Sequence, residues 1–494
     1  MPSYTPDTQL IAILLALLNE QREMICKLQE ACKELEAKVN KNSSNSSKPP
    51  STDGFSKTGD TREPSLTGGD DDKPAPKSQR SASGLKPGAQ KGHNGCCLEA
   101  VEHPDHIEYY PVLECEICQL NLSPESFLRY IEYQVFDPAS PGHFEVTAHR
   151  VEVKRCNCGH KNYGTLPRGV TGHVQYGSKT QALAVYLHQY QLIPCQRIVE
   201  FFRDIFNLPI STGTICNFQK KTFEQLESTE LAIASALMNE AVLGADETGM
   251  RVDKKTWWLH ALRSERWTLY HLSSKRGREA MDAMSVLLLF TGVLVHDHWK
   301  PYFHYAAIHV LCNAHHIREL QGVVDRDCNI LAARMKRLLQ LAWHLTKGFR
   351  KIGMVSMPAV VQDRIERLYQ RILKRALKDE EAFMERQRQY LNARKTRRTK
   401  ACNLFRRLLD YQSETLRFLS DFRVPFDNNG SERDVRMGKL KAKISGCFRS
   451  KSGAAWFARI RSYISSVRKH GRSVFESLLM AVENYSRIPL LGAE

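Results

Sequence analysis

The chain has 494 residues, too many for one ordinary core, so we expect several domains. It carries 71 Lys and Arg against 54 Asp and Glu, a formal net charge of +17, which favours a polyanionic partner, most often nucleic acid. Its longest early apolar run, Leu10 to Leu18, is nine residues and has no basic segment before it, which argues against a membrane span or a signal peptide. We therefore expect a reducing, intracellular compartment, in which paired cysteines among the 14 present bind metal rather than form disulfides.

Residues 1–41 predict a leucine-zipper-like coiled coil. The seam positions of its amphipathic helix are spaced alternately four and three apart: Leu14, Leu18, Gln21, Ile25, Leu28, Cys32, Leu35 and Val39. Residues 42–90, with "NSSNSSKPPSTDG", are poor in apolar side chains and predict a flexible linker. The alternative is a helix packed on its own domain, but this linker offers no surface for it, so we expect self-association of the chain.

Residues 91–172 predict a zinc-binding module. Cys115-x-x-Cys118 and Cys156-x-Cys158 form two close pairs, and four thiolates suit tetrahedral Zn²⁺. The segment between them alternates apolar and polar residues and predicts a β-hairpin that brings the pairs together. The second pair is closer than usual, and the possible substitutes as ligands are Cys96, Cys97, His103, His106 and His160.

Residues 173–235 predict a helical, helix-turn-helix-like DNA-binding region. "LPISTGTICNF" has the layout of a turn followed by a helix, with Ser211 or Thr212 as the N-terminal cap. A plain pair of antiparallel helices in a core fits the same pattern.

Residues 236–319 predict a mixed sheet with helices packed on it. The expected strands are 241–246, 256–263, 266–272, 292–297 and 308–312, with helices at 276–290 and after 312. Asp246 and Asp297 each follow a short apolar run that suits a buried central strand, so we expect both acids at strand ends. Such a pair can hold Mg²⁺, although a third acid must come from elsewhere. Glu247 is a rival to Asp246, since neighbouring strand residues face opposite sides.

Residues 320–425 predict a helical insertion, because apolar residues recur at spacings of three and four. Within it, "NARKTRRTK" at 392–400 is a basic cluster suited to DNA or to a solvated helix face. Between residues 431 and 470, eleven Lys and Arg stand against two acids. The aromatic residues among them are Phe448, Trp456, Phe457 and Tyr463. This mixture suits phosphate contact and base stacking, and we expect Arg449 and Lys451 to contact a DNA backbone.

Four motifs resemble those of the insertion sequence 66 family of transposases. "ADETG" contains Asp246 and matches the first-acid motif, and "HDHWKPY" contains Asp297 and matches the second-acid region. "CNAHH" carries a Cys-x-x-His element at Cys312 and His315, and "NNGSERDVR" matches the third-acid motif at Glu432. The resemblance covers most of the chain, from the zipper to the catalytic core.

The resemblance implies a multidomain α+β protein with a DDE catalytic core of the ribonuclease H-like fold. It implies that Asp246, Asp297 and Glu432 bind two Mg²⁺ or Mn²⁺ ions, with structural Zn²⁺ in the cysteine module. Such an enzyme binds the terminal inverted repeats of an insertion sequence, nicks the ends and joins the 3′-hydroxyls to target DNA. The implied setting is the bacterial cytoplasm at the nucleoid, with accessory proteins of the same element as further potential partners.

Residues 426–494 are expected to hold a core helix with the third acid, followed by a basic C-terminal region. We interpret Asn428, Asn429 and Gly430 as a turn and Ser431 as the helix cap, which puts Glu432 in the first helical turn. A basic face then begins on this helix: Arg433, Arg436 and Lys439.

Cys312 and His315 fit more than one role. A zinc site would need further ligands that are not nearby in sequence, and a nucleophilic Cys–His pair lacks a hydrolase motif. We expect packing and positioning beside the acids, with His315 near a DNA phosphate. Two other functions remain open for the whole chain: a non-catalytic DNA-binding remnant of a transposase, and a ribonuclease H-like nuclease without strand transfer.

Overall fold

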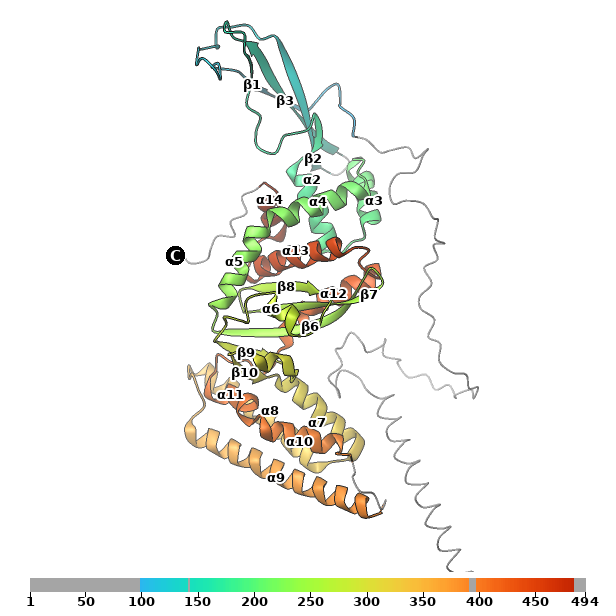
Figure 1. Ribbon diagram of the computed structural model, residues 1–494, viewed down its shortest axis with the longest axis vertical. Coiled ribbons are helices and arrows are strands. Elements are labelled where there is room, and N and C mark those ends of the chain that lie inside the picture. The colour runs from blue at the N-terminus through green and yellow to red at the C-terminus, as the bar shows by residue number, and fades with distance from the viewer. Residues whose placement is uncertain (1–97, 141–142, 391–396, 484–494) are drawn as a thin grey trace, which may run out of the picture. The chain divides into compact units, whose positions relative to one another are not determined.

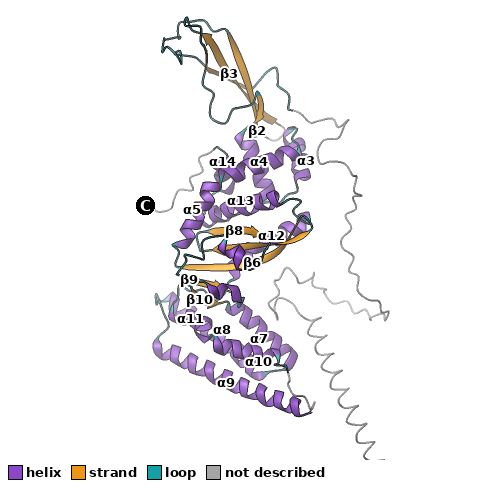
Figure 2. Ribbon diagram, in the orientation of Figure 1, coloured by secondary structure: helices purple, strands orange, loops and turns teal. Residues whose placement is uncertain are grey.

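The computed structural model describes residues 98–140, 143–390 and 397–483, which form a mixed α/β structure with two mixed sheets (Figures 1 and 2). The predicted coiled coil and linker, with Cys96 and Cys97, lie outside these residues. The described chain forms two compact units: residues 231–458, and residues 98–230 together with 459–483. None of the described helices combines the length and the hydropathy that a membrane span requires.

The unit that contains residues 98–230 begins with a five-stranded sheet of order β1-β3-β2-β5, with β4 paired to β3. Its strands are β1 (His106–Tyr110), β2 (Arg129–Ser140), β3 (His143–Arg155), β4 (Lys161–Tyr163) and β5 (Val174–Tyr176). β2 and β3 pair antiparallel, with Val135 opposite Thr147, which confirms the predicted hairpin. Alternate residues of β3 are buried, and this period of two is what the sequence pattern indicated.

Helices follow this sheet in the same unit. They are α2 (Ser178–Val185), the π-helix η2 (Tyr186–Tyr190), α3 (Cys195–Phe206), α4 (Thr212–Gln225) and α14 (Val474–Val482). α3 ends at Asn207, whose φ of 52° is left-handed, and Ser211 accepts a hydrogen bond from the Thr214 backbone N–H at 3.0 Å. Ser211 is therefore the cap of α4, one of the two residues predicted. A buried core that includes Phe136, Ile198 and Ile215 joins these helices to the sheet.

The unit of residues 231–458 is built on a five-stranded sheet of order β10-β9-β6-β7-β8. Its strands are β6 (Val242–Val252), β7 (Lys255–Arg263), β8 (Thr268–Ser273), β9 (Val293–His296) and β10 (Ile308–Leu311). β6, β7 and β8 form an antiparallel meander, and β9 and β10 extend it in parallel on the β6 side. All four residues of β9 are buried, as expected for a central strand with covered faces.

Helices make up most of the rest of this unit. They are α6 (Arg278–Asp282), the 3₁₀ helix η3 (Lys300–His304), α7 (Asn313–Asp327), α8 (Ile330–Lys351), α9 (Ala359–Tyr390), α10 (Lys400–Asp410), α11 (Gln412–Ser420) and α12 (Asn429–Ser445). One core runs from β9 and β10 through α7 to α11, and Tyr369 and Phe405 are wholly buried in it. The chain passes between the two units within α5 (Glu227–Met238) and α13 (Lys451–Lys469).

Two sequence predictions in this unit are wrong in detail. The helix expected at 276–290 is only α6, because Ser285 adopts a left-handed φ of 60° that a helix cannot accommodate. The strand expected to end at Asp246 continues to Val252, since β6 keeps pairing with β7 as far as Lys255. Asp246 thus lies inside β6, just beyond Gly244, where the pairing of β6 with β9 ends.

α12 crosses β6 and β7 at very short range. A Cβ atom on Gly244 would lie 2.7 Å from Asn428 Oδ1, and one on Gly438 would lie 2.9 Å from Leu259 Cδ2. The Asn428 side chain donates a hydrogen bond to the Ala245 carbonyl at 2.7 Å. Glycine at 244 is therefore needed for space rather than for a special backbone angle, and the contact sets the position of the first turn of α12.

We expect Gly244→Ala to lower the free energy of unfolding of this unit by about 1–3 kcal/mol, because the added methyl group overpacks the α12 contact. Gly348→Ala is the matched control, since Gly348 lies within α8 with no atom near its Cβ position, and it should raise stability by about 0.5–1 kcal/mol. All six tryptophans lie between residues 257 and 456, so fluorescence during urea unfolding reports on this unit. Equal effects of the two substitutions would contradict the proposed close approach.

Candidate active site and metal centre

Two of the predicted acids lie at the end of the β6–β9 pairing, and the third comes from the start of α12. Gly244 pairs with Val295, so Asp246 and Asp297 follow at the same level of two neighbouring parallel strands. Glu432 comes from the first turn of α12, which is anchored to β6 at Ala245. The charges of Asp297 and Glu432 both act on Asp246, so each of these two carboxylates lies within electrostatic reach of Asp246.

Burial dominates the electrostatics of the two aspartates. It raises the pKa of Asp246 well above its ordinary value, and the charges of Glu247, Asp297 and Glu432 raise it further. The pKa of Asp297 is raised for the same first reason and by Glu247, although the Trp299 backbone N–H donates to Asp297 Oδ1 at 2.9 Å and opposes the shift. Crowded, buried carboxylates of this kind are an oxygen donor set suited to a divalent cation, whose charge would offset the repulsion.

Glu247, the rival to Asp246, is already engaged on both oxygens. Its Oε1 accepts hydrogen bonds from Arg276 Nε and Nη2, at 3.0 and 2.7 Å, and its Oε2 accepts one from the Tyr302 hydroxyl at 2.7 Å. The Asp246 carboxylate accepts the backbone N–H of Glu247 at 2.9 Å. Asp246 is thus the better candidate ligand, and Glu247 orients Arg276 and Tyr302 beside it.

Arg276 is held between two indole rings next to the acids. Its guanidinium carbon lies 4.8 Å from the ring centroid of Trp258 and 4.4 Å from that of Trp299. The Arg276 side chain is 43% exposed, whereas that of Glu247 is 2% exposed. The pair places a fixed, solvent-facing cation at the rim of the acidic cluster, where a phosphate would be attracted.

The Glu432 carboxylate faces two side chains of α7. Arg318 Nη2 donates to Glu432 Oε1 at 3.0 Å, and His315 Nδ1 lies 3.7 Å from the same oxygen. The prediction that Ser431 caps the helix is wrong. α12 already begins at Asn429, and the buried Ser431 hydroxyl donates to Asn428 Oδ1 at 2.6 Å. Glu432 nevertheless lies in the first turn, as predicted.

Cys312 and His315 flank the start of α7, close to Glu432. Cys312 is buried, and burial raises the pKa of its thiol to about 12, which disfavours a thiolate nucleophile at neutral pH. The Cys312 sulfur accepts the backbone N–H of Asn428 at 3.1 Å. Sequence reasoning found no further ligand for this pair, but Cys312, His315 and Glu432 have ligand atoms within 4.8 Å of one another.

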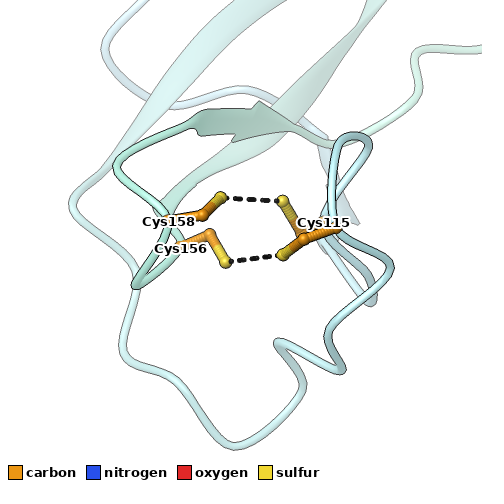
Figure 3. A group of neighbouring side chains, drawn as sticks. Cys115, Cys156 and Cys158 are labelled. Atoms are coloured by element: carbon orange, nitrogen blue, oxygen red, sulfur yellow. Dashed lines mark hydrogen bonds between the residues drawn. The ribbon is translucent and has the colours of Figure 1, made fainter.

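The second candidate metal centre is the group of four cysteines predicted from the sequence (Figure 3). Cys115 Sγ lies 3.6 Å from Cys158 Sγ, and Cys118 Sγ lies 3.4 Å from Cys156 Sγ. Zinc–sulfur bonds of ~2.3 Å at tetrahedral angles place sulfurs about 3.8 Å apart, so the four thiols fit a zinc ion closely. The Cys118 backbone N–H is the main cause that lowers the pKa of Cys115 to about 6, whereas burial and hydrogen bonds with the other cysteine thiols raise the pKa of Cys156 to about 12. Binding of a metal ion here would therefore have to displace a proton from at least one of the four thiols.

The two cysteine pairs lie on tight turns. Left-handed residues follow each pair, Gln119 with φ of 57° and Gly159 with φ of 88°. The Glu116 backbone N–H donates to the buried Asn162 side chain at 2.7 Å, which ties the first turn to β4. Among the described residues, His103, His106 and His160 belong to no group of potential metal ligands, so the four cysteines need no substitute.

The five basic residues expected to contact DNA are all at least partly exposed. Arg433, Arg436, Arg449 and Lys451 are exposed and Lys439 is half-buried, so all five remain candidates. The expectation that the interleaved aromatics stack on bases is wrong for Phe457 and Tyr463, which are buried in the core. Further along α13, Arg459 is paired with Glu230 at 2.6 Å, so it serves the fold instead.

Comparison with known families identifies most of the described chain. The model of the transposase IS66 family matches residues 173–456, which include the three acids, Cys312 and His315. The model of a family of unknown function (DUF6444) matches residues 5–99. No curated protein matches the chain.

We expect Cys118→Ser to remove one zinc ion per chain, because a structural site needs all four thiolates. Elemental analysis of the full-length protein measures the zinc content, and limited proteolysis tests whether residues 98–172 loosen. Cys216→Ser is the control, since Cys216 is exposed on α4 and outside both groups of potential ligands. Zinc content equal to that of wild type in Cys118→Ser would exclude the four-cysteine site.

Proposed function

The chain belongs to the IS66 transposase family, and on that basis we propose that it is a DNA transposase of the DDE type. It binds the terminal inverted repeats of an insertion sequence, nicks the element's ends by hydrolysis and joins the resulting 3′-hydroxyls to target DNA. The proposal is supported by the placement of Asp246 and Asp297 at the same level of β6 and β9, and by the charge of Glu432, from α12, acting on Asp246.

A ribonuclease H-like core for residues 236–319 and 426–445 is part of this proposal. An antiparallel meander extended by two parallel strands, with the first acid on the first strand and the second acid after the fourth, supports it. Residues 320–425, from within α7 through α11, then form an insertion between the second and third acids. In such an arrangement the rigid sheet fixes two ligands and a separate helix supplies the third.

Asp246, Asp297 and Glu432 would hold two Mg²⁺ or Mn²⁺ ions. When bound, these ions would offset charge on the attacking and leaving oxygens of a phosphoryl displacement. Arg276, fixed by Glu247 and the two indoles, attracts the phosphate to this edge of the sheet. Arg318 orients the Glu432 carboxylate, and the Asn428–Ala245 hydrogen bond keeps the helix that bears it at the correct distance from Asp246.

DNA recognition is assigned to surfaces outside the acids. Membership of a transposase family implies DNA binding, and we propose that the four-cysteine module with its Zn²⁺ and the helices α2 to α4 recognise the terminal repeats. Arg433, Arg436, Lys439, Arg449 and Lys451 contact the DNA backbone beside the cleavage site. Residues 1–41 pair two subunits as a coiled coil. The remaining partners in this proposal are DNA, in the bacterial nucleoid, and accessory proteins of the same element.

Asp246→Asn and Glu432→Gln should each reduce the rate of end cleavage in Mg²⁺ by more than ~100-fold, because each removes a carboxylate charge that binds the ions. Loss of a residue that only contacts a metal ligand costs about 10- to 100-fold, so a direct ligand should cost more. Binding to the element's ends, measured by mobility shift, should remain. Asp434→Asn is the matched control on the same helix, since Asp434 pairs with Arg263 at 3.2 Å instead.

The same assay separates the rival functions. Wild-type protein that binds the ends but never nicks them, with accessory proteins supplied, would indicate a non-catalytic remnant. Nicking without any joining to a target plasmid would indicate a nuclease.

Arg449→Ala combined with Lys451→Ala should weaken DNA binding at every sequence tested. The slope of log affinity against log salt is negative, and each lost phosphate contact makes it shallower by about 0.9. The slope of the double variant should therefore be shallower than that of wild type by about 1.8. The control is Arg375→Ala on α9, whose side chain is paired with Asp379 at 3.0 Å. An unchanged salt slope would remove both residues from the DNA interface.

A further inference from the structure

Besides the four-cysteine cluster and the proposed acidic site, the described residues contain a third group of potential metal ligands: Cys312, His315 and Glu432. Cys312 is the residue before α7, His315 lies in the first turn of α7, and Glu432 lies in the first turn of α12. The three ligand atoms lie within 4.8 Å of one another. Two helix starts, separated by more than a hundred residues of sequence, thus bring a thiol, an imidazole and a carboxylate to one point.

The surroundings of these atoms resemble those of a metal site more than those of a packed core. His315 Nδ1 is buried and has no hydrogen-bond partner among the described residues, although it faces Glu432 Oε1 at 3.7 Å. Buried polar nitrogens are rarely left in this state. The Asn428 backbone N–H points at the Cys312 sulfur at 3.1 Å, the kind of outer contact that supports a metal-bound thiolate.

We propose that Cys312, His315 and Glu432 form a binding site for Zn²⁺ that competes with the catalytic ions for Glu432. One thiolate, one imidazole and one carboxylate are zinc ligands, whereas Mg²⁺ avoids sulfur and requires oxygen. Three protein ligands leave a fourth position open for water or a phosphate oxygen. The competition rests on the proposed function, because Glu432 is there the third acid of the active site, but the zinc site itself does not.

The site should bind zinc reversibly and more weakly than the four-cysteine cluster. It offers three protein ligands instead of four, and only one of them is a thiolate. Arg318 Nη2 lies 3.0 Å from Glu432 Oε1 and must share that carboxylate with the ion, which costs affinity. A zinc ion held in this way draws Glu432 toward α7 and away from Asp246 and Asp297, so zinc acts as an inhibitor rather than as a structural ion.

The binding test uses the full-length chain dialysed to equilibrium against micromolar Zn²⁺. Wild type should retain two zinc ions per chain, and Cys312→Ala and His315→Ala should each retain one. Cys402→Ala is the matched control, because Cys402 is also a buried thiol but belongs to neither group of ligands, and it should retain two. In a Cys115→Ser, Cys118→Ser background, Co²⁺ should give a sulfur-to-cobalt absorption band that disappears with Cys312→Ala.

The competition test measures end cleavage in Mg²⁺ with increasing Zn²⁺, each variant relative to its own zinc-free rate. The half-inhibitory zinc concentration should rise at least tenfold in Cys312→Ala and in His315→Ala, and stay unchanged in Cys402→Ala. Equal inhibition of all four proteins would overturn the competition for Glu432, and a single zinc ion per wild-type chain would overturn the site. Because zinc is counted without any cleavage assay, a chain that binds two zinc ions but never cleaves DNA would contradict only the proposed transposase function.

Discussion

The contact between the start of α12 and the middle of β6 is the constraint on which the candidate active site depends. The hydrogen bond from the Asn428 side chain to the Ala245 carbonyl, at 2.7 Å, lies one residue from Asp246 and four residues from Glu432. It forms only because Gly244 has no side chain to occupy the space. The polar segment "DNNGSERDVR" is thus a docking element whose amide, hydroxyl and carboxylate each have a separate partner.

The four acids at this edge of the sheet differ in what they pair with. Glu247 is neutralised by Arg276, and Glu432 is held by Arg318, whereas Asp246 and Asp297 have backbone N–H donors and no cation at hydrogen-bond distance among the described residues. The two acids without a cationic partner are also the most strongly perturbed by burial. Because desolvation is the main cause of both shifts, an ion of the proposed kind would have to offset the burial of charged carboxylates as well as their mutual repulsion.

Local pattern was enough to predict the parts of the fold that depend on local chemistry. Apolar runs before Asp246 and Asp297 indicated the strands, alternation indicated the β2–β3 hairpin, and the spacing of four cysteines indicated the metal cluster. What failed depends on partners far away in sequence. Ser431 is a residue type that often caps helices, but its hydroxyl donates to Asn428 instead. Phe457 and Tyr463 stand among basic residues in the sequence, but both side chains are buried in the core. The proposed third ligand beside Cys312 and His315 could not be predicted because Glu432 is more than a hundred residues away in the sequence.

The long helical segment between the second and third acids also has a consequence for the order in which the parts of the candidate site are synthesised. The contact from Asn428 to Ala245 spans 183 residues, and pairings of such separation form late because loop closure precedes any gain from the contact. At ~5–20 residues per second, a ribosome needs about 10–40 s to make the chain between these two residues. During that time the sheet carries at most two of the three acids. A chain truncated before Glu432 therefore lacks one of the three acids on which the proposed cleavage depends.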